Sequence, residues 1–527
     1  MIKETKQEGE DIYEAKIKLA EELANYDKVK NNEQIKGSMG DMRNIMKRKK
    51  KLLKSIILIV ALMGIAFSVF NVIKNKDNDY IDKLIEKYSP QGAAIAVIEN
   101  GEITEVRNYG YSNVESKISV NNETQFKIAS ISKTITSYAV MKLVDEGKLN
   151  LDEPINTYLT KWKLPDTEFD ENKLTLRTLM SHTSGITGSD EIGYEYPLPT
   201  IEDALRERYI KLKREPGEVF EYSEFAGLGI CQLIIEEVTG EKFEKYMEDE
   251  VFKKLGMNNT NYANEIGESL LAVPYAGINK PIKVTPIVMN GGGGVSTTAS
   301  DLAKFTIELI NYHNNSNGEI FKAQKNTESV AGKYGLGIIP RELKSGKIVY
   351  EHNGTLTGWN AQMVMEPISK DGIVILTNSD KAFFLTYELM EKWSGKTIGE
   401  KVIDKQINVF VNMVYKCIAV LFAIVTLLIV IFIIKVRKGK IVLLERKKRN
   451  KKYLTSAIFC ILLAAIYFVS VYTEITFKLL FKMKDYYVFT FFPPSFSWIN
   501  VLLSLFAVFI VLRSGYTKVN KNMKELD

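Results

Sequence analysis

Cysteine and histidine are scarce in this chain. Its 527 residues include three Cys and three His. So few cysteines cannot form a disulfide framework, and all three lie in apolar or helical patterns that are typical of buried thiols. His182, His313 and His352 show no metal-ligand spacing among themselves. The sequence therefore predicts neither a metal site nor a bound cofactor.

Positive charge is present, but it is not arranged for nucleic acid. The net charge is +6, and Lys and Arg cluster beside long apolar runs rather than over a groove-like patch. We therefore expect the lipid bilayer to be a partner of this chain and nucleic acid not to be one. The length is also too great for one ordinary domain.

Four apolar runs are predicted to be transmembrane helices, because about 20 apolar residues span a bilayer. They are residues 55–73, 413–434, 453–473 and 498–512. The first run has no convincing cleavage site and is interpreted as an uncleaved anchor. No run has a charged residue near its centre, which favours anchoring or assembly over transport.

The basic residues predict the orientation of these helices. Lys and Arg precede the first run and fill the loop 435–452, and such loops stay in the cytoplasm. Segments 1–54 and 513–527 are then cytoplasmic, and domain 80–398 is extracellular. Loop 474–496 is aromatic and is expected at the outer membrane interface. We therefore predict a multi-pass cell-membrane protein. Residues 1–45 allow two interpretations, a cytoplasmic extension or a start codon upstream of true initiation near Met46.

The extracellular domain has strand patterns at both of its ends. Residues 93–99 and 103–109 are strand-like and are joined across Asn100-Gly101, which suits a type I′ hairpin turn. Residues 361–366 and 372–377 are again strand-like, and the middle is mostly helical. We expect the end strands to pair in one antiparallel sheet flanked by helices, with a mostly helical lobe beside it, in an α+β fold.

Ser130-Ile131-Ser132-Lys133 is the most informative motif, and it begins a helical pattern over residues 130–146. Residues three apart on a helix share one face, so the Lys133 amine can lie beside the Ser130 hydroxyl. A serine needs a neighbouring base to become a good nucleophile, and this spacing supplies one. An isolated match is a weak signal, for which an exposed helical turn with a solvated lysine is the plainer interpretation.

Further motifs follow in a set order. The sequence resembles the serine β-lactamase and penicillin-binding-protein superfamily over roughly residues 80–394, in particular its class C β-lactamase-like branch of D,D-peptidases, D-aminopeptidases and esterases. The matching segments are Phe126 to Lys133, Leu179 to Gly185, Pro216 to Ser223, Gly292 to Leu302 and His352 to Gly354.

The resemblance implies an acyl-enzyme mechanism. Ser130 would be the nucleophile, and Lys133 and Tyr222 would share the proton transfers. The backbone N–H groups of Ser130 and Thr355 would form the oxyanion hole. His352 and Gly354 would lie on a strand that faces the nucleophile and contacts substrate.

Plainer interpretations remain open for several of these residues. Tyr222 could be an ordinary core tyrosine, and His352 could orient rather than transfer protons. His182 is expected to stabilise its loop. The glycines at 291–294 lack the phosphate-loop pattern and are expected to form a tight turn, with Asp301 in the first turn of the next helix.

One motif departs from the family. The usual Tyr-x-Asn is Tyr222-Ser223-Glu224 here. Ionised Glu only accepts hydrogen bonds, whereas Asn also donates them, so Glu224 could pair with Lys133 and weaken the binding of β-lactams.

The sequence thus predicts a membrane-anchored serine hydrolase that acts outside the cell. Its expected substrates are cell-wall D-alanyl peptides or esters, or related esters and β-lactams. The alternative is a catalytically weak penicillin-binding sensor that signals through its transmembrane bundle. The sequence identifies no protein partner.

Overall fold

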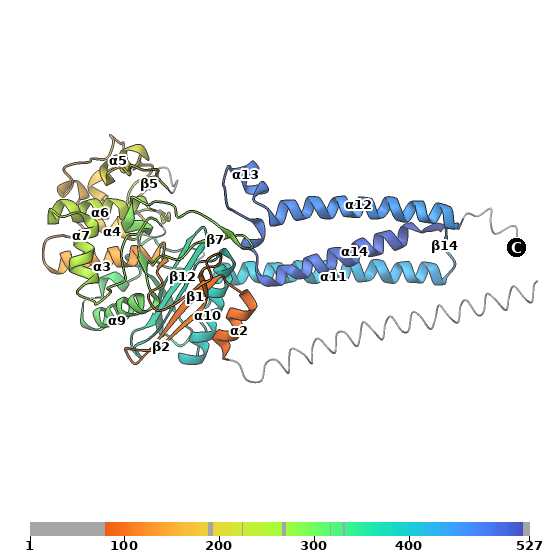
Figure 1. Cartoon of the computed structure of the whole chain (residues 1–527). Helices are drawn as coiled ribbons and strands as arrows, with labels where there is room; N and C mark the ends of the chain where they lie inside the picture. The colour runs from red at the N-terminus through yellow and green to blue at the C-terminus, as the bar shows by residue number, and fades with distance from the viewer. Residues whose placement is uncertain are drawn as a thin grey trace, which may run out of the picture. The chain divides into compact units, whose positions relative to one another are not determined.

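The computed structural model describes residues 79–187, 193–223, 225–265, 270–316, 318–329 and 332–519 (Figure 1). Residues Tyr80–Asp527 form one compact unit. The predicted cytoplasmic segment 1–54, the predicted anchor 55–73 and Glu224 lie outside the described residues.

A seven-stranded antiparallel sheet forms the centre of the hydrolase-like part, in the order β10-β11-β12-β13-β1-β2-β3. The strands from the two ends of the predicted domain pair with each other as expected, with Ala93 of β1 opposite Thr377 of β13. Asn100 and Gly101, between β1 and β2, both have positive φ (55° and 83°), as a type I′ turn requires. The strands are β1 (Gly92–Glu99), β2 (Glu102–Asn113), β3 (Ile118–Ser119), β10 (Ile339–Glu342), β11 (Ile348–Leu356), β12 (Trp359–Glu366) and β13 (Asp371–Thr377).

Helices cover both faces of this sheet. Successive side chains of a strand point to opposite faces, and β1 is apolar on both. Ile95 and Val97 pack with α2 (Tyr80–Tyr88) and α10 (Phe383–Thr397). Ala94, Ala96 and Ile98 belong to the larger core, which includes α3 (Ile131–Asp145) and α9 (Ala299–Asn315) (Figure 1). The observed architecture is the predicted α+β arrangement.

The middle of the chain forms the helical lobe, also as predicted. Its central helix, α6, is buried from Ala226 to Glu236, so the lobe shares the larger core. The α- and π-helices here are α4 (Leu176–Met180), α5 (Ile201–Glu207), α6 (Ala226–Thr239), α7 (Phe243–Tyr246), η3 (Met247–Phe252) and α8 (Asn290–Gly293). The short strand pairs are β4 (Phe126–Lys127) with β9 (Ser296–Thr297), β5 (Ile186–Thr187) with β6 (Lys211–Leu212), and β7 (Tyr275–Ala276) with β8 (Lys280–Pro281).

The glycine-rich segment differs from the expected tight turn. Residues 290–293 form one helical turn, α8, and Gly291 to Gly294 all have ordinary negative φ. A Cβ on Gly292 would lie 2.8 Å from the Phe225 Cα, and one on Gly291 would lie 2.6 Å from the Leu228 carbonyl oxygen. The glycines are therefore needed for the close approach of α8 to α6 and not for an unusual backbone conformation.

Among the described residues, three helices are long and apolar enough to cross a membrane. They are α11 (Lys405–Arg437), α12 (Arg446–Tyr472) and α14 (Ser497–Ser514), at the positions where the sequence predicted its last three spans. Between α12 and α14 lie α13 (Ile475–Phe481) and two short helical turns, η6 (Val488–Phe491) and η7 (Pro494–Phe496). At the opposite end, β14 (Ile441–Leu443) pairs with β15 (Tyr516–Lys518).

Candidate functional site

Ser130 stands at the N-terminus of α3, immediately after a strained turn. Strand β4 leads into it, and the Ile128 N–H donates to the Val295 carbonyl. Ala129 then has φ 47°, a left-handed conformation that costs a non-glycine residue energy and that often marks functional sites. Ser130 itself is the N-cap residue of α3, so it lies beside the first helical N–H groups.

Lys133 lies beside this hydroxyl. Its Nζ donates to the Ser130 Oγ at 3.1 Å and to the Gly292 carbonyl at 2.7 Å. The side chain is 0% exposed, so the interpretation as a solvated lysine is wrong. Lys127 is almost as deeply buried, at 1% exposed, and its Nζ donates to the Gly294 carbonyl at 2.8 Å. Two buried amines thus hold the same glycine-rich segment, but only Lys133 is bonded to the Ser130 hydroxyl.

The Tyr222 ring also lies near the Lys133 amine. The Nζ is 5.1 Å from the centre of the Tyr222 ring and 5.5 Å from that of Phe225, within the range of cation–π contacts. The His182 ring packs on Tyr222 with centroids 4.3 Å apart, and its Nδ1 accepts the Ser223 N–H at 3.1 Å. Burial holds the pKa of His182 well below its usual range, so this ring is neutral and positions the tyrosine segment.

Strand β11 approaches the nucleophile turn at Gly354. A Cβ there would lie 2.0 Å from the Ile128 carbonyl oxygen, so only glycine permits this approach. Strand β10 pairs with β11 only as far along β11 as Glu351. Beyond Glu351, no strand of the described ranges pairs with that edge of β11. Thr355, next along β11, is exposed, and its hydroxyl donates to the Asn360 side chain at 3.2 Å.

His352 is buried on β11, and hydrogen bonds occupy both of its ring nitrogens. Its Nδ1 is 2.7 Å from the Asn353 carbonyl oxygen, which can only accept, so Nδ1 carries the proton. Its Nε2 then accepts the hydroxyl of Tyr334 at 2.7 Å. Burial lowers the pKa of His352 to about 3. His352 is therefore neutral, which fits an orienting role.

Sequence reasoning missed Tyr334. It begins the segment Tyr334-Gly335-Leu336-Gly337, and a Cβ on Gly337 would lie 2.3 Å from the Ser137 Oγ of α3. The Thr134 hydroxyl donates to the Gly337 carbonyl at 2.6 Å. The two glycines that follow this tyrosine, at one and three residues, were the signal that the segment packs closely against another element.

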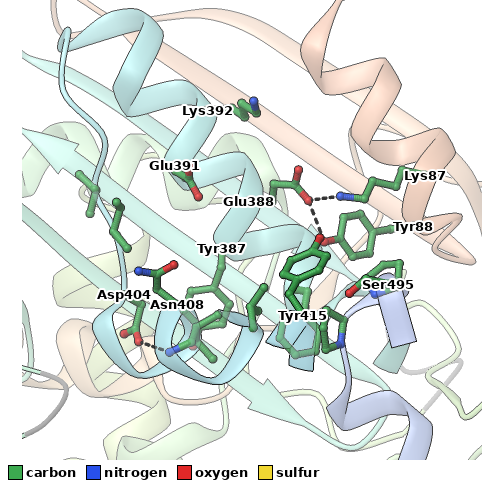
Figure 2. Close-up of a pocket in the computed structure, with 17 residues that line it drawn as sticks. Lys87, Tyr88, Tyr387, Glu388, Glu391, Lys392, Asp404, Asn408, Tyr415 and Ser495 are labelled. Carbon is green, nitrogen blue, oxygen red and sulfur yellow. Dashed lines mark hydrogen bonds and ion pairs between the residues drawn. The ribbon is translucent and has the colours of Figure 1, made fainter. Parts of the chain in front are cut away.

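A separate cavity of about 240 Å³ lies where α2, α10 and α11 meet (Figure 2). There the Glu388 carboxylate accepts the Lys87 amine at 2.5 Å and the Tyr88 hydroxyl at 2.8 Å. None of the candidate site residues lines this cavity. Within the described ranges, no group of His, Cys, Asp and Glu could hold a metal ion.

The sheet, its helical covering and the placement of α3 define the serine-hydrolase fold of β-lactamases and penicillin-binding proteins. Residues 78–390 match the protein-family model for Beta-lactamase, and the chain belongs to this family.

Relatives and solved structures agree with this assignment. Protein flp of Staphylococcus aureus (strain COL) is 26% identical over 480 residues, 85% of this chain and 93% of that protein. The putative penicillin-binding protein PbpX of Bacillus subtilis (strain 168) is 28% identical over 57% of this chain and 73% of its own length. The octameric penicillin-binding protein homologue from Pyrococcus abyssi has a TM-score of 0.52 at 24% identity, over 61% of this chain and 76% of that one. The last likeness shows the fold alone.

Proposed function

We propose that this protein is a membrane-anchored serine hydrolase of the class C-like branch, with Ser130 as its nucleophile. The observation that carries the proposal is the 3.1 Å hydrogen bond from the buried Lys133 amine to the Ser130 hydroxyl. An amine that is bonded to a serine hydroxyl and shielded from water can accept the hydroxyl proton as the serine attacks.

The reaction proceeds in two acyl transfers. The Ser130 Oγ bonds to the substrate carbonyl carbon, and its proton passes to the Lys133–Tyr222 pair. The backbone N–H groups of Ser130 and Thr355 stabilise the oxyanion, a contribution typically worth about 3 kcal/mol per donor. The pair then protonates the leaving group as its bond to carbon breaks. Water cleaves the acyl-serine by the same route in reverse and restores the hydroxyl.

The proposed location is the outer face of the cell membrane. The basic loop 435–452 would be cytoplasmic, and the domain before α11 would then be extracellular. Cell-wall D-alanyl peptides or D-alanyl esters are the substrates that this location offers, with other esters and β-lactams as related acyl donors.

Intact mass of the detergent-purified full chain tests the nucleophile. After brief incubation with p-nitrophenyl acetate, we expect a single acetyl adduct on the wild type and none on Ser130→Ala. Ser132→Ala is the matched control, because this nearby serine of α3 is buried and its Oγ accepts the Val295 N–H. Equal labelling of Ser130→Ala and the wild type would contradict the proposal.

A second candidate function is a sensor that is acylated and signals through its helices. It is favoured by an ionic link between the β7–β8 hairpin and the loop that follows α12. The Lys280 amine lies 2.6 Å from the Asp485 carboxylate and 3.3 Å from that of Glu474. A sensor would keep its acyl group, so release of product over many turnovers by the purified chain would exclude this candidate.

A further inference from the structure

The strand that faces the nucleophile offers no positive charge to a substrate. His352 is the titratable ring on this part of β11, and it is 1% exposed. Its single proton is donated from Nδ1 to the Asn353 carbonyl, and Nε2 accepts the Tyr334 hydroxyl. Both nitrogens are occupied by protein groups, so His352 has none free for a substrate carboxylate, and a proton gained at Nε2 would require the Tyr334 hydroxyl to turn from donor to acceptor.

The second histidine of the site is similar. His182 Nδ1 accepts the Ser223 N–H, so its proton is on Nε2, a buried atom with no hydrogen-bond partner in the described part of the chain. The ring is packed between Tyr222 and Tyr334, with centroid distances of 4.3 and 5.0 Å. This packing keeps the ring away from bulk water, and burial keeps it neutral.

The buried basic side chains around the site bond to protein groups. Lys133 is bonded to the Ser130 hydroxyl and the Gly292 carbonyl, where it serves the reaction itself. Lys127 is bonded to the Gly294 carbonyl. Arg341, the other cation near His352, is held by the Glu351 and Asp404 carboxylates at 2.7 and 2.8 Å.

The short segments between the described ranges add no cation. Their sequences contain no Lys, Arg or His, and their titratable residues are Asp190, Glu191, Glu224 and Glu268. A carboxylate on the leaving group would therefore lie beside the strand with no cation from β11 or from these segments to compensate its charge.

We infer that this site takes acyl donors whose leaving group is uncharged, esters or substituted amides, and discriminates against donors with a carboxylate beside the scissile bond. The inference rests on the proposed function, since it names the substrate class of that reaction. The Ser130 Oγ–acyl bond forms as the bond to the leaving oxygen or nitrogen breaks. The serine proton leaves with that group as an alcohol or amine, and water then releases the acid.

Two depsipeptides test this with the purified full chain, N-acetyl-D-alanyl-D-lactate and its D-lactamide. They share the acyl group and the ester bond and differ in the charge next to it. Rates of alkaline hydrolysis without protein correct for intrinsic reactivity. We expect the corrected kcat/KM of the wild type to be at least about tenfold higher for the lactamide. Equal values, or a preference for the lactate, would overturn the inference.

A charge placed on the strand provides the second readout. His352→Lys should shift the corrected ratio toward the lactate by about tenfold relative to His352→Gln, which keeps the position uncharged. The same ratio in both variants would contradict the inference. If His352→Lys does not fold, the wild-type ratio of corrected kcat/KM values for the lactamide and the lactate is the test of the inference. Failure of both depsipeptides and of p-nitrophenyl acetate to acylate Ser130 would instead reject the proposed function and the inference with it.

Discussion

The two sides of the candidate site are built from different chemistry. The helical side, formed by α3 and α8, buries two lysine amines against backbone carbonyls. The strand side, formed by β11 and Tyr334, contains His352, which burial keeps neutral and two hydrogen bonds hold in place. We interpret the helical side as the source of proton transfer and the strand side as the source of shape and backbone donors.

The largest loss of catalytic rate should come from a substitution on the helical side. Lys133→Met removes the amine beside Ser130 while keeping a long apolar stem, and we expect kcat/KM for p-nitrophenyl acetate to fall about 10³-fold or more. Lys127→Met is the matched control, because it also removes a buried amine that donates to a glycine carbonyl, without touching the Ser130 hydroxyl. It should reduce thermal stability and change the rate far less. Similar rate losses in both variants would mean that Lys133 acts through packing.

A comparison of two tyrosines tests the boundary between the sides. Tyr222→Phe removes the hydroxyl of the ring next to Lys133, and kcat should fall about 10²-fold if this group moves protons. Tyr334→Phe removes the hydroxyl that donates to His352. It should lower the rate less than about tenfold, because its partner is a positioning group. Steady-state kinetics on one ester measures both, and the reverse order would refute the assignment.

The strand side can also be disturbed through its shape alone. Gly354→Ala places a Cβ 2.0 Å from the Ile128 carbonyl and must push β11 from the nucleophile turn. We expect a loss of about 1–3 kcal/mol in stability and a clear fall in kcat. Gly395→Ala, in helix α10, is the control, since the nearest atoms to its Cβ belong to the flexible Lys401 side chain. It should stabilise by about 0.5–1 kcal/mol. An active and stable Gly354→Ala would show that the approach of β11 is not required.

The smallest expected effect is a pH dependence of folding stability that comes from Asp380, beside the β11–β12 turn. Asp380 accepts the N–H groups of Gly358, in the β11–β12 turn, and of Gly277. Burial raises the pKa of Asp380 to about 7. Above its unfolded pKa, near 4, the folded state keeps a proton that the unfolded state has lost, so stability should fall as pH rises from about 4 to 7.

Thermal unfolding of the purified chain between pH 4.5 and 7.5 measures this trend. The slope due to Asp380 should be on the order of 1 kcal/mol per pH unit, and Asp380→Asn should remove it. An identical slope in the variant would show that Asp380 is ionised throughout. His352 adds a slope of the opposite sign below about pH 6.5, because the folded ring, with its pKa lowered to about 3, stays neutral where the unfolded ring gains a proton. That contribution is common to the wild type and Asp380→Asn, so the difference between their slopes reports Asp380.

Local patterns predicted a large part of this molecule. The apolar, strand-like run over residues 93–99, the Asn-Gly turn and the three-residue spacing of Ser130 and Lys133 each depend on neighbours along the chain. The resulting hairpin, the start of α3 and the Ser130–Lys133 contact agree with these predictions. The last three apolar runs coincide with α11, α12 and α14 in the same way.

Other features required the tertiary structure. The sequence His352-Asn353-Gly354 is the same whether the histidine is charged or neutral. Its protonation state is set by burial and by its contact with Tyr334, 18 residues away. The glycines of α8 were expected in a turn because close packing against Phe225 and Leu228 is invisible in local sequence. Spacing along one helix or hairpin is set by backbone geometry and can be read from the chain. Protonation and close approach depend on which distant segments remove the water around a group, so the fold alone determines them.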